Sequence, residues 1–426
     1  MRRLFVFINL FVLINLSVQG QDSLDWDIDS VFDEPLHESP VEETPVDTDG
    51  LSVRNLIQRR GFHFDASYNF LAGIAPGWYN LPTNSDTREY YLDRYIKMRT
   101  TLGIDAQISD NFRTKTTIYF EIPGFDFVLG DFFFDYNIYD VVFLRGGKYN
   151  HSWGISPNYG FTNLLSRVAR DDNPADDNPA DSFIFKVDVP IGNGGFQALV
   201  LTRLDLMRST ALPKLEDFGY GGKYNLALRH VDLDLGMFYQ DGMALRSFLS
   251  IKTTIGSTEL YNEWVGAIDV NEPSNLSGAF NIGFGRDFFG GKFNVNGELF
   301  YNAEKDTYWY HPETNIREAG ETPFIEGLNF ALNLLYKPWE KGNPRFFLQA
   351  RYAPMQNSAL LVPGFRLSPW PHIDFYLATP LSLGNKDGYY HNNTVTRATE
   401  NEDKPLPFAV IFLISLSGSV QFGHYY

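Results

Sequence analysis

The pair of residues in this chain that most resembles catalytic machinery is His151 followed directly by Ser152. A hydrolase built on these residue types needs the imidazole beside the hydroxyl, so that it can accept the proton of the attacking oxygen. In an extended chain, adjacent side chains point to opposite faces. The two groups therefore cannot meet on one face, and we expect neither a catalytic residue nor an enzymatic activity.

A second concentration of reactive groups is a perfect tandem repeat of Asp-Asn-Pro-Ala-Asp at 172–181. Asn-Pro steps favour turns that Asp and Asn cap, so one interpretation is a turn-rich loop. A carboxylate cluster for a hard cation such as Ca²⁺ is an alternative, although the repeat lacks the ligand spacing of a calcium loop. The acidic side of a pore constriction is a third, with Arg167 and Arg170 upstream neutralising part of the charge.

Composition and spacing exclude several other kinds of site. The chain has no cysteine, which excludes a disulfide scaffold and a thiolate metal site. Its eight histidines are dispersed without metal-ligand spacing, so we expect no metal and no cofactor. The glycines of 219–222 fall within an expected strand, whereas a phosphate loop requires a strand-to-helix turn. No basic patch indicates nucleic acid as a partner.

The N-terminal part of the chain predicts export followed by a disordered tail. Residues 1–20 combine Arg2 and Arg3 with an apolar stretch and a small-residue end, which is typical of a secretory signal peptide. Residues 21–50 contain many acids, several prolines and neither Lys nor Arg. Such a segment cannot bury a core, so we expect 21–55 to be an acidic, disordered periplasmic segment.

The end of the chain separates into an apolar face and a polar face. Side chains alternate across a strand, and a transmembrane barrel strand places apolar residues toward lipid and polar residues toward a wet lumen. This segment also ends on an aromatic residue, Tyr426, and we expect the barrel-assembly machinery to recognise it. The apolar face carries Phe412, Ile414, Leu416, Val420 and Phe422, and the polar face carries Ser415, Ser417, Ser419 and Gln421.

The same alternation recurs along 56–426 and predicts an all-β, closed, antiparallel transmembrane β-barrel of about eighteen strands. Sixteen strands is the alternative, because Ser257–Ile268 and Ser358–Leu367 alternate poorly. The expected strands are 61–73, 94–108, 113–122, 126–136, 141–149, 182–189, 195–204, 219–228, 231–240, 245–255, 257–268, 276–288, 292–302, 325–337, 345–353, 358–367, 372–382 and 407–426.

The connections between these strands are sorted by length. Joins after even-numbered strands are short and turn-like, whereas all the long joins follow odd-numbered strands. A barrel with both termini in the periplasm has short periplasmic turns and long external loops. The pattern therefore predicts location in the outer membrane, with its lipid bilayer as a partner. The long joins are 74–93, 150–181, 205–218, 303–324 and 383–406.

The stretch Leu144–Gly154 combines a Gly-Gly-Lys strand end with a following Trp-Gly. It resembles the corresponding region of the substrate-selective and general porins of outer membranes. The resemblance implies that the loop after the fifth strand, here 150–181, folds into the lumen and forms a constriction. Its expected lining is acidic on the loop and basic on the wall and just upstream of the acids: Asp171, Asp172, Asp176 and Asp177, with Lys97, Arg99, Lys115, Arg167 and Arg170.

The function that follows is diffusion of small hydrophilic solutes through a porin, with a preference for cations and a possible homo-oligomer. A fatty-acid or other hydrophobic-substrate transporter is an alternative, although 21–54 is too short and acidic for the plug of that family. A surface adhesin or structural barrel is another. An outer-membrane hydrolase is a further one, which requires His and Ser two apart on one strand face, unlike His151 and Ser152.

Overall fold

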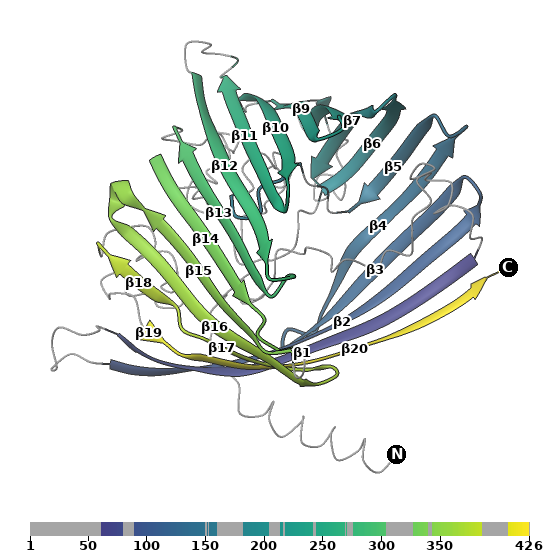
Figure 1. The fold of residues 1–426 in the computed structure, drawn as a ribbon. Helices are drawn as coiled ribbons and strands as arrows, with labels where there is room; N and C mark the ends of the chain where they lie inside the picture. The colour runs from purple at the N-terminus through teal and green to yellow at the C-terminus, as the bar shows by residue number, and fades with distance from the viewer. Residues whose placement is uncertain are drawn as a thin grey trace.

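The computed structural model describes residues 61–79, 89–149, 151, 153–159, 182–203, 214–215, 218–241, 244–268, 270, 276–303, 327–339, 343–385 and 408–425. Almost all of these residues are in strands that form one sheet, arranged as a ring around a central space (Figure 1). No helix among the described residues is long and apolar enough to cross a membrane.

Within the described residues, twenty strand segments and the short 3₁₀ helix η5 follow one another along the chain. From β1 to β17 each strand pairs antiparallel with the next, as in an up-and-down arrangement, and β17 pairs with β20. The segments are β1 (Gly61–Tyr79), β2 (Glu89–Ser109), β3 (Phe112–Ile122), β4 (Asp126–Ile138), β5 (Val142–Lys148), β6 (Ser182–Ile191), β7 (Gly194–Arg203), β8 (Gly219–Ala227), β9 (Val231–Gln240), β10 (Leu245–Ile255), β11 (Thr258–Ile268), β12 (Leu276–Phe288), β13 (Phe293–Asn302), β14 (Gly327–Tyr336), β15 (Arg345–Ala353), η5 (Pro354–Gln356), β16 (Ser358–Trp370), β17 (Ile373–Ala378), β18 (Leu381–Gly384), β19 (Phe408–Ala409) and β20 (Ile411–Tyr425).

Two strands are interrupted at a point where proline removes a backbone donor. β17 and β18 both pair with β16 and are separated by Thr379 and Pro380. β19 and β20 both pair with β1 and are separated by Val410, whose N–H donates to the carbonyl of Pro76 at 3.0 Å. Pro76 has no N–H to donate in return, so the ladder is broken there. Counting each interrupted strand once gives a closed barrel of eighteen strands, which confirms the predicted fold class.

Closure comes from the first and last strands of the barrel. β1 pairs with β20 from Gly61 opposite Tyr425 to Ile74 opposite Phe412. The two strands lie side by side although they come from opposite ends of the chain (Figure 1). Both strands that alternate poorly are present as β11 and β16, so the alternative of sixteen strands is wrong. Their inner faces carry apolar residues such as Val265 and Val362, which weakens the alternation.

The hairpin of β1 and β2 is longer than the sequence predicted. The expected loop 74–93 is largely strand, because β1 continues to Tyr79 and β2 begins at Glu89. Pro76 and Gly77 are local turn signals, but β1 is paired here with β2 on one side and with β19 on the other. Tertiary pairing therefore overrides the local preference of these residues.

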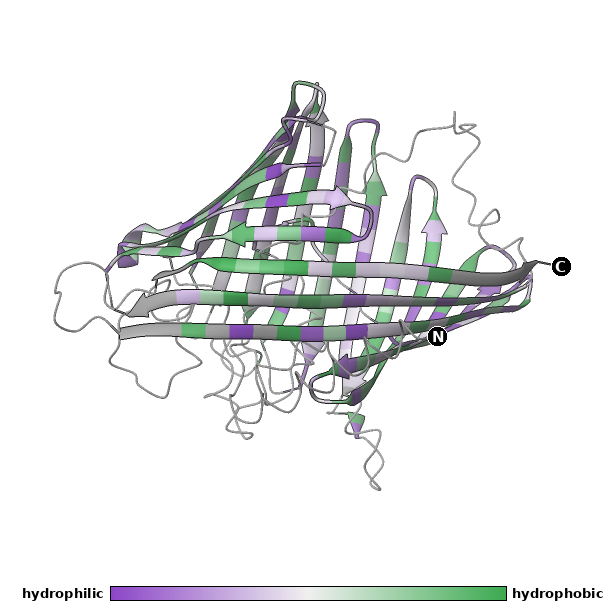
Figure 2. Cartoon of the chain, turned by 90° about the horizontal axis from the view of Figure 1, so that it is seen from below, coloured by the Kyte–Doolittle hydropathy of each residue, from purple (hydrophilic) through white to green (hydrophobic). Residues whose placement is uncertain are grey.

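The outer face of the barrel is apolar and the inner face is mainly polar. In β20, Phe412, Ile414 and Val420 are exposed on the outside, whereas Ile411 and Ser415 are buried on the inside. The same division recurs along the barrel, with hydrophobic and hydrophilic positions alternating along the strands (Figure 2). A barrel that is surrounded by lipid and encloses water requires this division.

A pair of arginine substitutions in β20 tests the face assignment. Leu416 faces outward, and an arginine there should cost about 2–4 kcal/mol if it lies near the midplane of the bilayer. Ser417 faces inward, so Ser417→Arg should assemble nearly normally. We expect Leu416→Arg to reduce the fraction of heat-modifiable, folded protein in the membrane, as measured by unheated gel electrophoresis. Equal loss for both variants would contradict the assignment.

Candidate functional site

The connection that follows β5 enters the lumen of the barrel. We call its described part, Tyr149, His151 and Trp153–Tyr159, the inner segment. Its residues contact inward-facing side chains from β7 to β15, so it follows the inner wall across a large part of the ring. The segment thus occupies lumen space that the barrel would otherwise leave to water.

Trp153 is the first anchor of the inner segment and is 2% exposed. Its ring lies 5.4 Å from that of Phe248 on β10, measured between centroids. A Cβ atom on Gly221 would lie only 2.6 Å from the Trp153 ring, and one on Gly236 would lie 2.3 Å from Phe248. The glycines of β8 and β9 therefore make room on the inner wall for these two aromatic rings.

Gln197 on β7 forms a hydrogen bond with the indole N–H of Trp153. Gln197 Oε1 accepts a hydrogen bond from Trp153 Nε1 at 2.8 Å, and Gln197 Nε2 donates to Asp188 at 2.7 Å. His151 Nε2 also lies 2.9 Å from Gln197 Oε1 and must be the donor, because that oxygen can only accept. Burial lowers the pKa of His151, which lies outside the strands, so its imidazole is neutral at pH 7.

Two buried carboxylates hold the middle of the inner segment. Glu263 on β11 accepts from the backbone N–H of Ile155 at 2.8 Å and from Ser250 at 3.1 Å. Glu298 on β13 accepts from Ser156 Oγ at 2.9 Å and from the backbone N–H of Asn158 at 3.1 Å. These bonds satisfy backbone and side-chain donors that would otherwise be unpaired in a crowded part of the lumen.

A second aromatic anchor ends the described part of the segment. Tyr159 is buried, and its ring stacks on that of Phe300 of β13 with centroids 4.8 Å apart and an interplanar angle of 15°. Aromatic pairs of this kind add about 0.5–1.5 kcal/mol beyond the area that they bury. The inner segment is therefore fixed by rings at both ends and by carboxylates between them.

Charged side chains line the inner wall from β2 to β6, and they are paired with one another. Arg145 Nε donates to Asp135 at 2.6 Å, and Arg113 Nε donates to Asp105 at 2.8 Å. The Arg145 guanidinium also lies 4.4 Å from the centroid of the Phe133 ring. Further ion pairs lie on the same wall. Lys186 pairs with Asp188 within β6, Lys223 on β8 pairs with Asp234 on β9, and Lys252 on β10 pairs with Glu259 on β11.

Three of the residues predicted for the constriction lie on this wall. Lys97, Arg99 and Lys115 all face the lumen. Arg99 pairs with Glu121, and Lys115 Nζ lies 3.8 Å from Asp131 Oδ2. The sequence analysis did not predict Glu121 and Asp131 as partners of these bases. The alternation along β3 could have indicated that Arg113 and Glu121 face the lumen. The other predicted members lie outside the described residues: Arg167, Arg170, Asp171, Asp172, Asp176 and Asp177.

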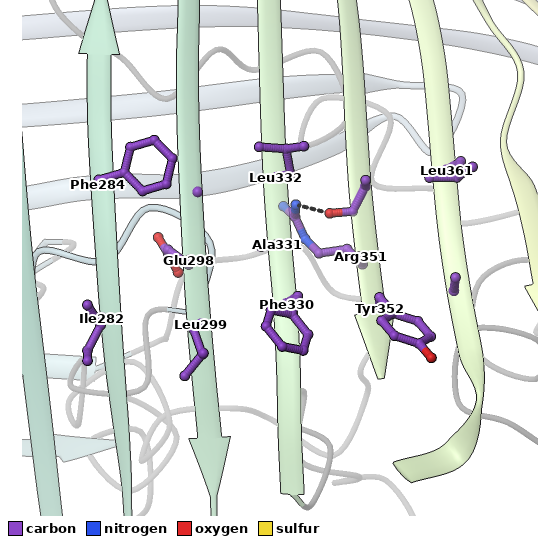
Figure 3. A pocket seen from close by; sticks show the side chains of 13 residues that line it. Ile282, Phe284, Glu298, Leu299, Phe330, Ala331, Leu332, Arg351, Tyr352 and Leu361 are labelled. Atoms are coloured by element: carbon purple, nitrogen blue, oxygen red, sulfur yellow. Dashed lines mark hydrogen bonds between the residues drawn. The ribbon is translucent and has the colours of Figure 1, made fainter. Parts of the chain in front are cut away.

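An apolar groove of about 470 Å³ crosses the outer face of β12–β16. Figure 3 shows its side chains in two rows across these strands, with Phe284, Leu332 and Leu361 in one row. The other row contains Ile282, Leu299, Phe330 and Tyr352. Its floor contains the small residues Gly297, Ala350 and Ala359. The groove therefore belongs to the outer face of the wall whose inner face holds the middle of the inner segment.

Within the described residues, no group of three or more His, Asp or Glu side chains has an arrangement that could hold a metal ion. No protein-family model matches the sequence. A search of curated proteins finds no match.

Solved structures provide the one positive comparison. The chain is similar to OpdO of Pseudomonas aeruginosa, with a TM-score of 0.52, 12% sequence identity and coverage of 85% of this chain and 97% of that one. It is also similar to OpdQ of the same organism, with a TM-score of 0.52, 8% identity and coverage of 85% and 98%. OccAB3 of Acinetobacter baumannii gives a TM-score of 0.50, 8% identity and coverage of 85% and 99%. The chain therefore has the fold of a porin-like outer-membrane β-barrel.

Proposed function

We propose that this chain is a channel of the outer membrane through which small hydrophilic solutes diffuse. The observation that carries the proposal is a closed barrel with an apolar outer face and an inner wall of partly exposed ion pairs. Such a wall favours water and polar solutes over hydrocarbon. The similar structures are outer-membrane channels, which supports the same class.

We also propose how the chain is exported and inserted into the outer membrane. Residues 1–20 act as a signal peptide, and 21–55 form an acidic periplasmic segment. The last strand is the element that the barrel-assembly machinery recognises, and both termini lie in the periplasm. Homo-oligomers are compatible with the exposed apolar outer face, because this face can contact either lipid or a second copy.

The simplest test is the permeability of liposomes that contain the purified protein. We expect swelling in small sugars and amino acids that falls off with solute size, and stepwise conductance in planar bilayers. A protein that inserts as a heat-modifiable barrel but shows neither swelling nor conductance would contradict the channel proposal. It would favour a structural barrel or a carrier of hydrophobic substrates.

A pair of glycine variants on β8 tests whether the position of Trp153 sets the width of the channel. In Gly221→Leu the added side chain would occupy the place of the Trp153 ring, since even a Cβ atom there would lie 2.6 Å from it. We expect an altered single-channel conductance, because the inner segment must move. The matched control is Gly222→Leu, which adds the same side chain to the outer face of the same strand. Equal conductance changes in both variants would contradict this role.

We also propose that 150–181 forms the constriction and that its acids give a preference for cations. Fixed charges at a narrow point set ion preference because they act at short range. Deleting 171–181 should raise the conductance and weaken the selectivity, as measured by the reversal potential in a salt gradient. Arg99→Glu should strengthen the cation preference, because it adds negative charge to the facing wall. An unchanged conductance and reversal potential in the deletion variant would contradict the proposal.

A further inference from the structure

The side-chain amide of Asn158 forms hydrogen bonds with four residues of the barrel wall. Its Oδ1 accepts from Arg351 and from Asn333 Nδ2, each at 2.7 Å. Its Nδ2 donates to Asn296 Oδ1 at 2.7 Å and to Glu298 Oε1 at 2.9 Å. An amide has two acceptor sites and two donors, and all four are used here. Three neighbouring strands, β13, β14 and β15, thus converge on one residue of the inner segment.

Glu298 is the acceptor on which this arrangement depends. Besides the bonds from Asn158, its carboxylate accepts from Ser156 Oγ at 2.9 Å and from Tyr261 Oη at 2.7 Å. Asn281 Nδ2 donates at 3.3 Å to Glu298 Oε2, the oxygen that also accepts from Ser156. Glu298 itself is only 4% exposed. Both carboxylate oxygens therefore accept hydrogen bonds from several donors.

The amide of a glutamine cannot replace this carboxylate without loss. One end of the amide is itself a donor, so either Asn158 and Tyr261 or Ser156 and Asn281 would lose the carboxylate oxygen that accepts from them. A buried donor without an acceptor is costly, and bonds to charged groups are stronger than neutral ones. Glu298 makes three hydrogen bonds to the inner segment, from Ser156 Oγ and from the backbone and side chain of Asn158.

We propose that Glu298 is the positioning residue of the channel: through Asn158 and Ser156 it fixes the inner segment against the wall and so sets the open width of the lumen. Arg351 completes the site by fixing the orientation of the Asn158 amide from β15, and Figure 3 shows Glu298 and Arg351 on their two strands. The inference rests on the proposed channel function. A solute does not need to touch Glu298 for this role.

The first test is Glu298→Gln, examined by single-channel recording in planar bilayers with the full-length protein. We expect the fraction of time spent away from the main conductance level to rise about tenfold, a factor that corresponds to about 1.4 kcal/mol. The matched control is Glu259→Gln on β11, which removes one inward-facing carboxylate that pairs with Lys252. It should keep the wild-type gating pattern. Equal gating changes in the two variants would mean that charge alone matters, and would overturn the proposal.

A charge exchange tests the bond itself. In Asn158→Asp combined with Glu298→Gln, the carboxylate moves to the segment, where it accepts from Arg351, Asn333 and the new amide. We expect this double variant to lie closer to the wild-type dwell times than Glu298→Gln does. The recovery should be partial, because the backbone N–H of residue 158 and Tyr261 Oη still lose the carboxylate oxygen that accepts from them. A double variant that is no closer to wild-type gating than Glu298→Gln, in protein that assembles, would overturn the proposal.

A substitution in the inner segment distinguishes an effect on gating from a defect in barrel assembly. Asn158→Ala removes the side-chain bonds to Glu298, Asn296, Asn333 and Arg351, keeps the backbone N–H that donates to Glu298, and leaves every strand intact. It should therefore assemble and change gating in the same direction as Glu298→Gln. Wild-type gating in Asn158→Ala would overturn the role of Glu298. Absence of any conductance in the wild-type protein would instead contradict the proposed function, so the two failures are distinguishable.

Discussion

The pairing of β1 with β20 is the contact on which the rest of the barrel depends. Every strand of a sheet needs two neighbours, and an unpaired edge in hydrocarbon leaves backbone groups that cost several kcal/mol each. Fourteen consecutive pairs, from Gly61 to Ile74, close the ring. The two interruptions occur beside Pro76 and at Pro380, where a donor is missing in any conformation. At these two points proline leaves no hydrogen bond to lose, whereas the other irregularities of the ladder are register shifts within paired strands.

Closure also decides where side chains go. Once the ring is closed, alternate residues of each strand must point outward or inward, and no third environment exists along the strands. Outward positions carry Phe, Leu, Ile and Tyr, and inward positions carry the ion pairs and the contacts of the inner segment. Trp153 and Phe248 fit inside because Gly221 and Gly236 leave space opposite them. Small residues on the wall and large residues in the lumen are thus complementary parts of one packing arrangement.

Sequence alternation and the sorting of loop lengths together predicted about eighteen antiparallel strands, which the structure confirms. Alternation alone left sixteen open, because β11 and β16 carry apolar residues on both faces. It failed at 74–79, where Pro76 and Gly77 indicate a turn and only pairing with two neighbours keeps the chain extended. Alternation also placed Lys97, Arg99 and Lys115 on the inner face. It could not identify Glu121 or Asp131 as their partners, since the choice among several inward acids depends on the register between strands.

The residues that hold the inner segment could not be predicted from sequence patterns, because they lie far away along the chain. Asn158 contacts Arg351, which lies 193 positions further along the chain, and Ile155 contacts Glu263, which lies 108 positions away. No local periodicity encodes such contacts, because they depend on which strands face each other across a closed ring. The motif Leu144–Gly154, which contains Trp153, did indicate that this connection differs from the other loops. What it could not supply was the wall of Gln197, Glu263 and Glu298 that receives the segment.

The pairing of charges on the inner wall has a consequence for selectivity. A base held about 3 Å from an acid, as in Lys223 with Asp234, presents a dipole to the lumen, and the field of a dipole falls off faster than that of a single charge. Salt screens what remains within roughly 8 Å at physiological ionic strength. In the channel that we propose, the paired wall therefore acts on a solute only at short range, whereas discrimination between ions requires charges that have no such partner close by.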